Sequence, residues 1–197
     1  FTFKAGDSLY GTFACRTVDQ LLVFANNGKV YSVPVSALPG ARGDGVPITT
    51  LIELASGARI LHYFAGAQDL VLLLANSSGY GFSARLGDMV SRTKGGKAFF
   101  SLEEGETLLP PQVLASGHTL IACLSDTAHL LVFAREELKT LASGGRGTMF
   151  IKLGDKEQLQ LLRACGPKGV LVQGIGRGSK PQEIQISNSA LAAHTGK

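Results

Sequence analysis

The chain repeats one pattern about every 50 residues. Asn26, Asn76 and Asp126 stand 50 residues apart, and each closes an apolar run and opens a polar turn. A fourth apolar run begins at Leu171, where the period requires it. A period of roughly 20–50 residues is typical of folds that stack copies of one small unit or arrange them around an axis. The repeat therefore constrains the fold, and it directs the search for function toward a surface that recurs along the chain.

Each copy predicts about four short strands. The apolar runs LLVF, VLLL and IACL are each followed by a tight turn, at 26–29, 76–80 and 125–129, and a fourth turn is expected at 174–178. The Asn-Gly pair in the first turn favours a β-hairpin, because both residues tolerate positive φ. A second strand leaves each turn, and a further apolar strand leads into the next unit. In the first three units a Gly-rich basic segment lies between these two strands.

Four strands in about 50 residues, joined by Gly-rich turns, are typical of a propeller blade or a close relative. We therefore predict an all-β, propeller-like fold of about four to five four-stranded blades, in a closed or an open ring. The units are expected at approximately 6–56, 57–104, 105–153 and 154–197, the last incomplete, within a single domain over residues 1–197. A pair of β-sandwiches is the alternative, but the register holds across the four copies to within a residue or two.

The composition is that of a globular protein with a small excess of positive charge. Hydrophobic residues make up 45% of the chain, charged residues 17%, and the formal net charge is +4. No apolar run approaches the ~20 residues that cross a bilayer, and no basic region precedes an apolar stretch, so we expect neither a membrane span nor a signal peptide. The charge permits an anionic partner without requiring one. The chain opens at Phe1 in mid-pattern, which suggests a fragment of a longer protein.

The three cysteines have a spacing that fits no zinc site and cannot complete a set of disulfides. Cys15 and Cys165 lie three periods apart, and Cys123 belongs to an apolar run. We predict that all three are small core residues of a reduced, cytosolic protein.

Catalytic motifs are missing from the sequence. It contains no GxxxxGK[ST] loop, no GxSxG elbow and no HExxH, and the four histidines fall at different phases of the repeat. The run GIGRGSK at 174–180 lacks the helix that a dinucleotide loop needs, and is interpreted as a turn. Asp7, Glu106 and Asp155 belong to Gly-acid turns, where we expect them to cap backbone amides. We therefore predict no catalytic residue and no metal site in this chain.

The most distinctive polar segment is 92–97, in which three cations surround two glycines. Glycines let the backbone approach a ligand, and cations neutralise phosphates. The same phase of other units carries a basic, Gly-rich loop, so an arc of positive charge could follow a bent duplex through phosphate contacts. Solvated cations that only aid solubility are the alternative. The predicted DNA-binding residues are Arg42, Arg92, Lys94, Lys97 and Arg146, supported by Lys29, Arg85 and Arg177.

Several of these segments resemble the C-terminal domain of bacterial type IIA topoisomerase A subunits. The first repeats of that family correspond to 28–31 (Gly-Lys-Val-Tyr), 38–39 (Leu-Pro) and 42–45 (Arg-Gly-Asp-Gly). Residues 79–82 and 95–98 are more similar to the topoisomerase IV type than to gyrase. The resemblance covers nearly the whole chain. It implies a β-pinwheel, a propeller-like fold whose neighbouring blades exchange a strand, with DNA bound on the outer rim.

The resemblance also implies a role for the domain. It would bind and bend duplex DNA without catalysis of its own, and so help an ATP-dependent enzyme to decatenate and relax chromosomes during segregation. No cofactor is expected here, because ATP and Mg²⁺ would be used by other domains. The implied partners are double-stranded DNA, an ATPase B subunit in a heterotetramer, and the rest of the A subunit, in the cytoplasm on the chromosome. Segment 92–97 departs from the Gln-Arg-Arg-Gly-Gly-Lys-Gly box of gyrase, which argues against gyrase-style wrapping.

A protein-binding propeller, of the WD or chromosome-condensation type, is the competing hypothesis. The chain has no Trp, and hence no Trp-Asp dipeptide at its strand ends. Its loops carry glycines and cations, whereas a protein-binding face favours exposed aromatic residues. A propeller enzyme is less consistent still, because converging acids or ligands are missing at the inner turns.

Overall fold

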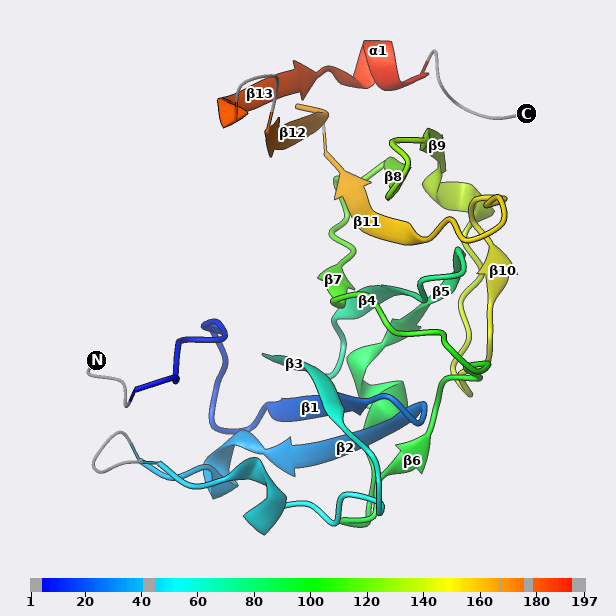
Figure 1. Cartoon of the computed structure of the whole chain (residues 1–197). Coiled ribbons are helices and arrows are strands. Elements are labelled where there is room, and N and C mark those ends of the chain that lie inside the picture. Colours follow the sequence, from blue (N-terminus) through cyan, green and yellow to red (C-terminus); the bar gives the residue numbers. More distant parts are fainter. Residues whose placement is uncertain (1–4, 41–44, 167, 176–178, 193–197) are drawn as a thin grey trace.

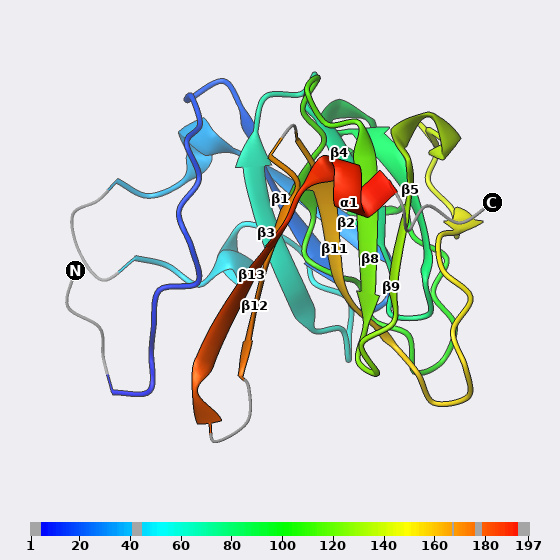
Figure 2. The same ribbon diagram turned by 90° about the horizontal axis from the view of Figure 1, so that it is seen from above.

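The computed structural model describes residues 5–40, 45–166, 168–175 and 179–192. Its strands form four antiparallel sheets that follow one another along the chain on a curved path (Figure 1). Seen from above, the first three sheets lie over one another and the last hairpin crosses them at an angle (Figure 2). The fold is all-β and propeller-like, as the repeat predicts.

The first sheet has the order β3-β1-β2-β6 and the second β10-β5-β4-β7, while the third contains β11-β8-β9 and the fourth β12-β13. Short helices follow several of the hairpins. The strands are β1 (Gln20–Ala25), β2 (Lys29–Pro34), β3 (Ile60–Gly66), β4 (Val71–Ala75), β5 (Tyr80–Arg85), β6 (Lys97–Ala98), β7 (Gln112–Val113), β8 (Leu120–Ser125), β9 (Leu130–Ala134), β10 (Thr148–Met149), β11 (Leu159–Cys165), β12 (Val170–Ile175) and β13 (Pro181–Ile186). The helices are η1 (Val35–Ala37), η2 (Ile48–Thr50), η3 (Leu86–Met89), η4 (Arg135–Glu137) and α1 (Asn188–Ala192).

Each sheet is built on one hairpin, and the hairpins coincide with the sequence repeat. Pairing begins at Gln20 with Pro34 in β1–β2 and at Val71 with Arg85 in β4–β5. The β8–β9 hairpin follows the same plan. The turns of the first two hairpins contain Gly28 and Gly79 at φ +74° and +82°, a region that favours glycine. The predicted polar turns are therefore the hairpin turns of the structure.

Neighbouring units exchange a strand. β6 follows the β4–β5 hairpin but pairs with β2 of the first sheet, and β10 follows β8–β9 but pairs with β5 of the second. The backbone crosses each hairpin turn closely, since the amides of Phe100 and Phe150 donate to the carbonyls of Gly28 and Gly79 at 2.9 and 2.7 Å. This exchange is the feature expected of a β-pinwheel. In the described part of the chain, no strand pairs with the outer edge of β9.

The core lies between successive sheets, and the exchanged segments supply part of it. Between the first and second sheets, the ring of Phe82 lies 5.9 Å from that of Phe99 and 5.7 Å from that of Phe100. Between the second and third, Phe133 packs against Phe150 at 5.2 Å. Burial of one such side chain contributes about 1.5–3 kcal/mol. The exchanged segments therefore join neighbouring units through both hydrogen bonds and packing.

Two expectations of the sequence require correction. Cys123 and Cys165 are buried, and burial raises the pKa of both thiols, to about 12 for Cys123. Cys15, however, is exposed. Cys165 lies on β11, which pairs with β8, whereas Cys15 lies outside the described strands. In the fourth repeat, β12 extends to Ile175, whereas the turn was expected to begin at residue 174.

None of the described helices has the length and apolarity needed to cross a bilayer.

The fourth sheet is an open part of the molecule, because the side chains of Leu171, Ile175 and Ile184 are all exposed. The main core therefore lies within the first three sheets.

Candidate nucleic-acid interface

The basic segment that the sequence singled out is held firmly against the first sheet. The Ser91 amide donates to Ser32 Oγ at 2.8 Å, and Ser32 Oγ donates to the Ser91 carbonyl at 3.0 Å. The Glu53 amide donates to the Lys94 carbonyl at 2.9 Å. Gly96 has φ +71°, and a Cβ there would lie 2.7 Å from the ring of Tyr31. The loop therefore has a fixed path, and glycine is required where it passes over Tyr31.

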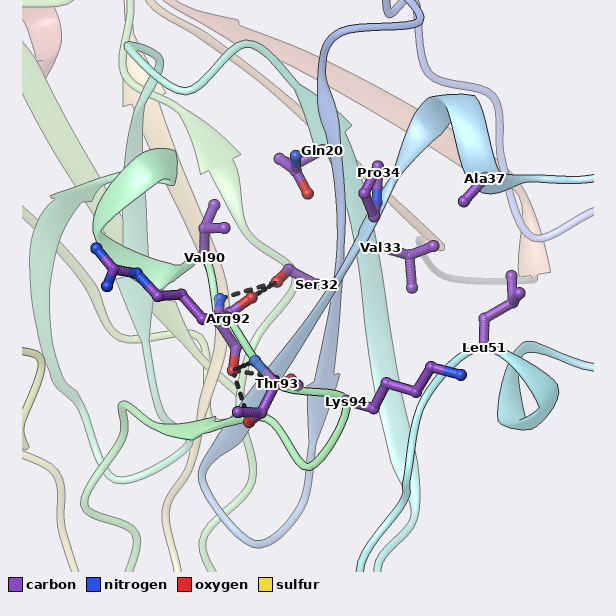
Figure 3. A pocket seen from close by; sticks show the side chains of 11 residues that line it. Gln20, Ser32, Val33, Pro34, Ala37, Leu51, Val90, Arg92, Thr93 and Lys94 are labelled. Atoms are coloured by element: carbon purple, nitrogen blue, oxygen red, sulfur yellow. Dashed lines mark hydrogen bonds between the residues drawn. The ribbon is translucent and has the colours of Figure 1, made fainter.

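Arg92 and Lys94 are exposed on this anchored loop. Their side chains extend in opposite directions from it, beside a cavity of about 420 Å³ between β2 and the loop (Figure 3). Neither side chain forms an ion pair with a described carboxylate. Two positive charges are thus presented to solvent from a rigid support, which suits contact with an anionic ligand.

Other predicted cations are used inside the protein. Lys97 Nζ donates to the Asp88 carbonyl at 2.6 Å and lies 5.5 Å from the centre of the Phe99 ring. Lys29 Nζ donates to the carbonyl of Gly95 at 3.3 Å. Both lysines are half-buried, and their ammonium groups are held by these backbone carbonyls.

Arg146 has the most internal surroundings of the predicted cations that the structure describes. Its Nη1 lies 2.5 Å from Glu103 Oε1, its Nη2 lies 2.6 Å from Glu106 Oε1, and its guanidinium lies 4.3 Å from the centre of the Tyr80 ring. The Glu106 side chain is only 5% exposed and also accepts hydrogen bonds from Asn76 Nδ2 and from the Glu103 amide. Two carboxylates therefore oppose the charge of Arg146.

Of the remaining predicted residues, one lies on the surface and two lie outside the described residues. Arg85 is exposed at the end of β5, where its backbone amide donates to Asp88 Oδ2 at 3.1 Å. Arg42 and Arg177 lie outside the described residues. The structure thus brings Arg92, Lys94 and Arg85 to the surface as cations free of ion pairs with described carboxylates.

Two further cations lie on the segment that leaves the third hairpin, and the search for Gly-rich basic loops missed them. Arg135 opens η4, where its Nη1 donates to the carbonyls of Ala115 and His118 at 2.6 and 3.1 Å. Lys139 is exposed four residues later. The alignment on the hairpin turns places both in the segment that follows the second strand of the third unit, but the prediction considered only the Gly-rich loops.

The acidic turns serve the backbone. Asp7 accepts from the Ser8 amide, and Glu106 accepts from the Glu103 amide of its own turn. In the corresponding third turn, the acid that accepts from the Gly154 amide is Glu157, two residues beyond the expected Asp155. Hydrogen bonds from the hydroxyls of Ser125 and Thr127 and from the Gly154 amide lower the pKa of Glu157 to about 2.

Across the described ranges, no cluster of three or more His, Cys, Asp or Glu residues has the geometry to hold a metal ion. What the arrangement offers is a set of rigidly supported cations on the edges of successive sheets. Such a set can neutralise phosphates, and phosphate contacts position a duplex without reading its sequence.

Comparison with known proteins relates the sequence to topoisomerases. The family model described as DNA gyrase C-terminal domain, beta-propeller, matches residues 19–61 and 130–165. The chain is 36% identical to the A subunit of DNA topoisomerase 4 from Neisseria gonorrhoeae, over 99% of this chain and 26% of that relative. It is 34% identical to the protein of the same name from Haemophilus influenzae, over 77% of this chain and 20% of the relative. The chain thus spans at most about a quarter of these curated relatives.

Solved structures give the same relationship for the fold. The Escherichia coli ParC C-terminal domain superposes with a TM-score of 0.87 at 27% identity, over 100% of this chain and 80% of that one. A C-terminal domain of DNA topoisomerase IV and one of DNA gyrase A give TM-scores of 0.76 and 0.69 at 17% and 19% identity. They cover 94% and 96% of this chain, and 59% and 61% of their own. At these lower identities, the last two likenesses concern the fold alone.

Proposed function

The chain belongs to the family of C-terminal domains found in the A subunits of DNA gyrase and topoisomerase IV, and from this premise we propose that it is the DNA-binding domain of a topoisomerase IV A subunit. The observation that carries the proposal is the anchored loop with Arg92 and Lys94 exposed. Ser32, Glu53 and Tyr31 fix the path of this loop. The backbone of a loop held in this way loses little freedom when its cations meet a phosphate.

The domain grips the DNA backbone and bends it. Contacts from Arg and Lys to phosphates release counterions and position a duplex without reading its sequence. The sheets follow a curved path, so a duplex that contacts several of them must curve as well (Figure 1). Bending a site of 20–30 base pairs costs about 1–6 kcal/mol, which additional phosphate contacts offset.

Within the parent enzyme, the domain holds one duplex for passage through another, and so assists decatenation and relaxation of supercoils on the chromosome. This chain is the non-catalytic part. Strand cleavage belongs to the remainder of the A subunit, while ATP and Mg²⁺ belong to a B subunit; both are its proposed partners in a heterotetramer. The partial coverage of the topoisomerase relatives supports this division, because the chain corresponds to about a quarter of such a protein or less.

The proposal is tested by binding of the 197-residue chain to a labelled duplex of random sequence across a salt series. We expect a linear fall of log K with log salt, with a slope of about −0.9 per phosphate contacted. The double variant Arg92→Gln/Lys94→Gln should reduce that slope by about 1.8, because two contacts are lost. The control is Lys168→Gln/Lys180→Gln, which removes the same charge from exposed positions around the fourth sheet.

Circular dichroism spectra of both double variants establish that the fold is intact. If the wild-type chain fails to bind DNA even at low salt, the DNA-binding role is wrong, and the protein-binding propeller takes its place. If the control pair reduces the slope as much as Arg92→Gln/Lys94→Gln, net charge matters and the anchored loop does not.

A further inference from the structure

We infer that the domain carries a series of equivalent phosphate seats, one beside each exchanged segment, and that Arg85 and Arg135 form the second seat. The inference rests on the proposed DNA-binding function and deepens it. The first seat is the notch between β2 and residues 91–94. The second is the notch between β5 and residues 135–140.

The two notches occupy the same place in successive units. Ser32 on β2 and Ser83 on β5 hold the same register position, because Pro34 and Arg85 pair with the first residues of β1 and β4. The first cavity is lined by Gln20, Ser32, Pro34 and Ser91, and the second by their equivalents Val71, Ser83, Arg85 and Thr140. Their volumes are about 420 and 240 Å³.

In both notches, a serine of the strand forms hydrogen bonds to the neighbouring segment. In the second, Ser83 Oγ lies 2.9 Å from Thr140 Oγ1 and donates to the Lys139 carbonyl at 3.3 Å. The backbone of Ser83 also bonds the amide of Leu141 and the carbonyl of Lys139, each at 2.9 Å. In the first notch, the Ser32 hydroxyl accepts from the Ser91 amide and donates to the Ser91 carbonyl. Each notch is therefore a rigid recess with hydroxyl groups at its junction.

The second notch presents two guanidinium groups that lack a carboxylate partner in the described part of the chain. The Arg85 side chain is exposed, while one nitrogen of Arg135 donates to the carbonyls of Ala115 and His118. Among the nearby acids, Asp88 accepts from the Arg85 amide and Glu137 accepts from the Ala134 amide. Glu136, next to Arg135 in the chain, is exposed and forms no ion pair with it. The positive charge of this notch is thus left for an external anion.

The chemistry of the recess suits a phosphodiester. Guanidinium groups match phosphate oxygens with two parallel hydrogen bonds, and the carbonyl contacts hold Arg135 in place. In the first seat, the cations are Arg92 and Lys94 of the anchored loop. In the second, Arg85 lies at the end of β5 and Arg135 lies in η4.

The test uses the 197-residue chain, random-sequence duplex and a salt series. Arg85→Gln removes a cation whose side chain forms no ion pair with the described residues. We therefore expect the salt slope to fall by about 0.9 and affinity at ~0.1 M salt to fall about eight-fold. Arg85→Lys should recover most of this loss. Arg135→Gln should act in the same direction, and the matched control Lys180→Gln should change the slope less.

The seat is refuted if Arg85→Gln and Lys180→Gln bind alike while the wild-type chain keeps its steep salt dependence. That outcome leaves the proposed DNA-binding function intact. If the wild-type chain does not bind DNA at all, both the proposed function and the seats are wrong. The two failures are therefore distinguishable. Equal loss in Arg85→Gln and Arg85→Lys would also overturn the seat, since a phosphate contact must respond to charge.

Discussion

Gly28 lies where the exchanged segment crosses the first hairpin, and substitution by alanine should disrupt that crossing. The residue has φ +74°, and a Cβ built on it would lie 2.2 Å from the carbonyl oxygen of Phe100. The carbonyl of Gly28 accepts hydrogen bonds from the amides of Phe99 and Phe100 at 3.0 and 2.9 Å. The methyl group therefore meets backbone that is itself bonded to the substituted residue.

The magnitude follows from three contributions. Alanine in the left-handed region costs about 1 kcal/mol relative to glycine. The oxygen of Phe100 must withdraw by about 1 Å, which strains or breaks two hydrogen bonds that each contribute about 1 kcal/mol. The same shift loosens the Phe100 ring, which packs 6.0 Å from Phe24 and 5.7 Å from Phe82. We expect Gly28→Ala to lower the free energy of unfolding by about 3–5 kcal/mol, a large share of a typical domain's stability.

The assay is urea unfolding followed by circular dichroism, with Ala128→Gly as the matched control. Ala128 occupies the same position in the third hairpin at φ 67°, and within the described ranges no strand pairs with that hairpin's outer edge. Ala128→Gly should change stability by about 1 kcal/mol or less, because relief of strain is offset by the greater freedom of glycine in the unfolded chain. A loss of only about 1 kcal/mol in Gly28→Ala would refute the close crossing.

Two further predictions concern groups inside the domain. Arg146→Met should lower the melting temperature in a thermal scan, because Glu106 loses its main cationic partner. The salt slope of DNA binding should stay unchanged. A reduced slope would instead make Arg146 a phosphate contact. Glu157 has a pKa lowered to about 2 from its ordinary 4.5, so its contribution to stability is present above pH ~4.5 and is lost as pH falls toward 2. Urea midpoints between pH 6 and 2 should fall less in Glu157→Gln than in the wild type; parallel profiles would contradict this assignment.

The hairpins could be predicted from the sequence because their determinants are local. Asn26, Asn76 and Asp126 mark the turns, and the apolar runs before them become β1, β4 and β8. The exchanged strands are different. The pairing of Lys97 with Val30 joins residues far apart in the chain, and periodicity alone does not distinguish it from pairing within a unit. Only the family resemblance supplied that expectation.

The surroundings of Arg146 could not be read from the repeat for a related reason. Lys97 lies six positions after Ser91 in the second unit, whereas Thr148 lies eight positions after Thr140, the counterpart of Ser91, in the third. The phase of the repeat therefore shifts within this segment. The partner Glu106 lies 40 residues earlier in the chain, so no local pattern reveals the ion pair.

The exchanged segment links the stability of the domain to its proposed function. Residues 91–100 contain the exposed Arg92 and Lys94 and also Phe99 and Phe100, which pack between the first two sheets. Because the packing of the two rings fixes the backbone that carries the cations, the ordering entropy is lost during folding and not when DNA binds. A loop of the same charge on a free linker would bind phosphates more weakly. Strand exchange therefore helps to convert a modest net charge of +4 into a rigid array of cations along the curved path of the sheets.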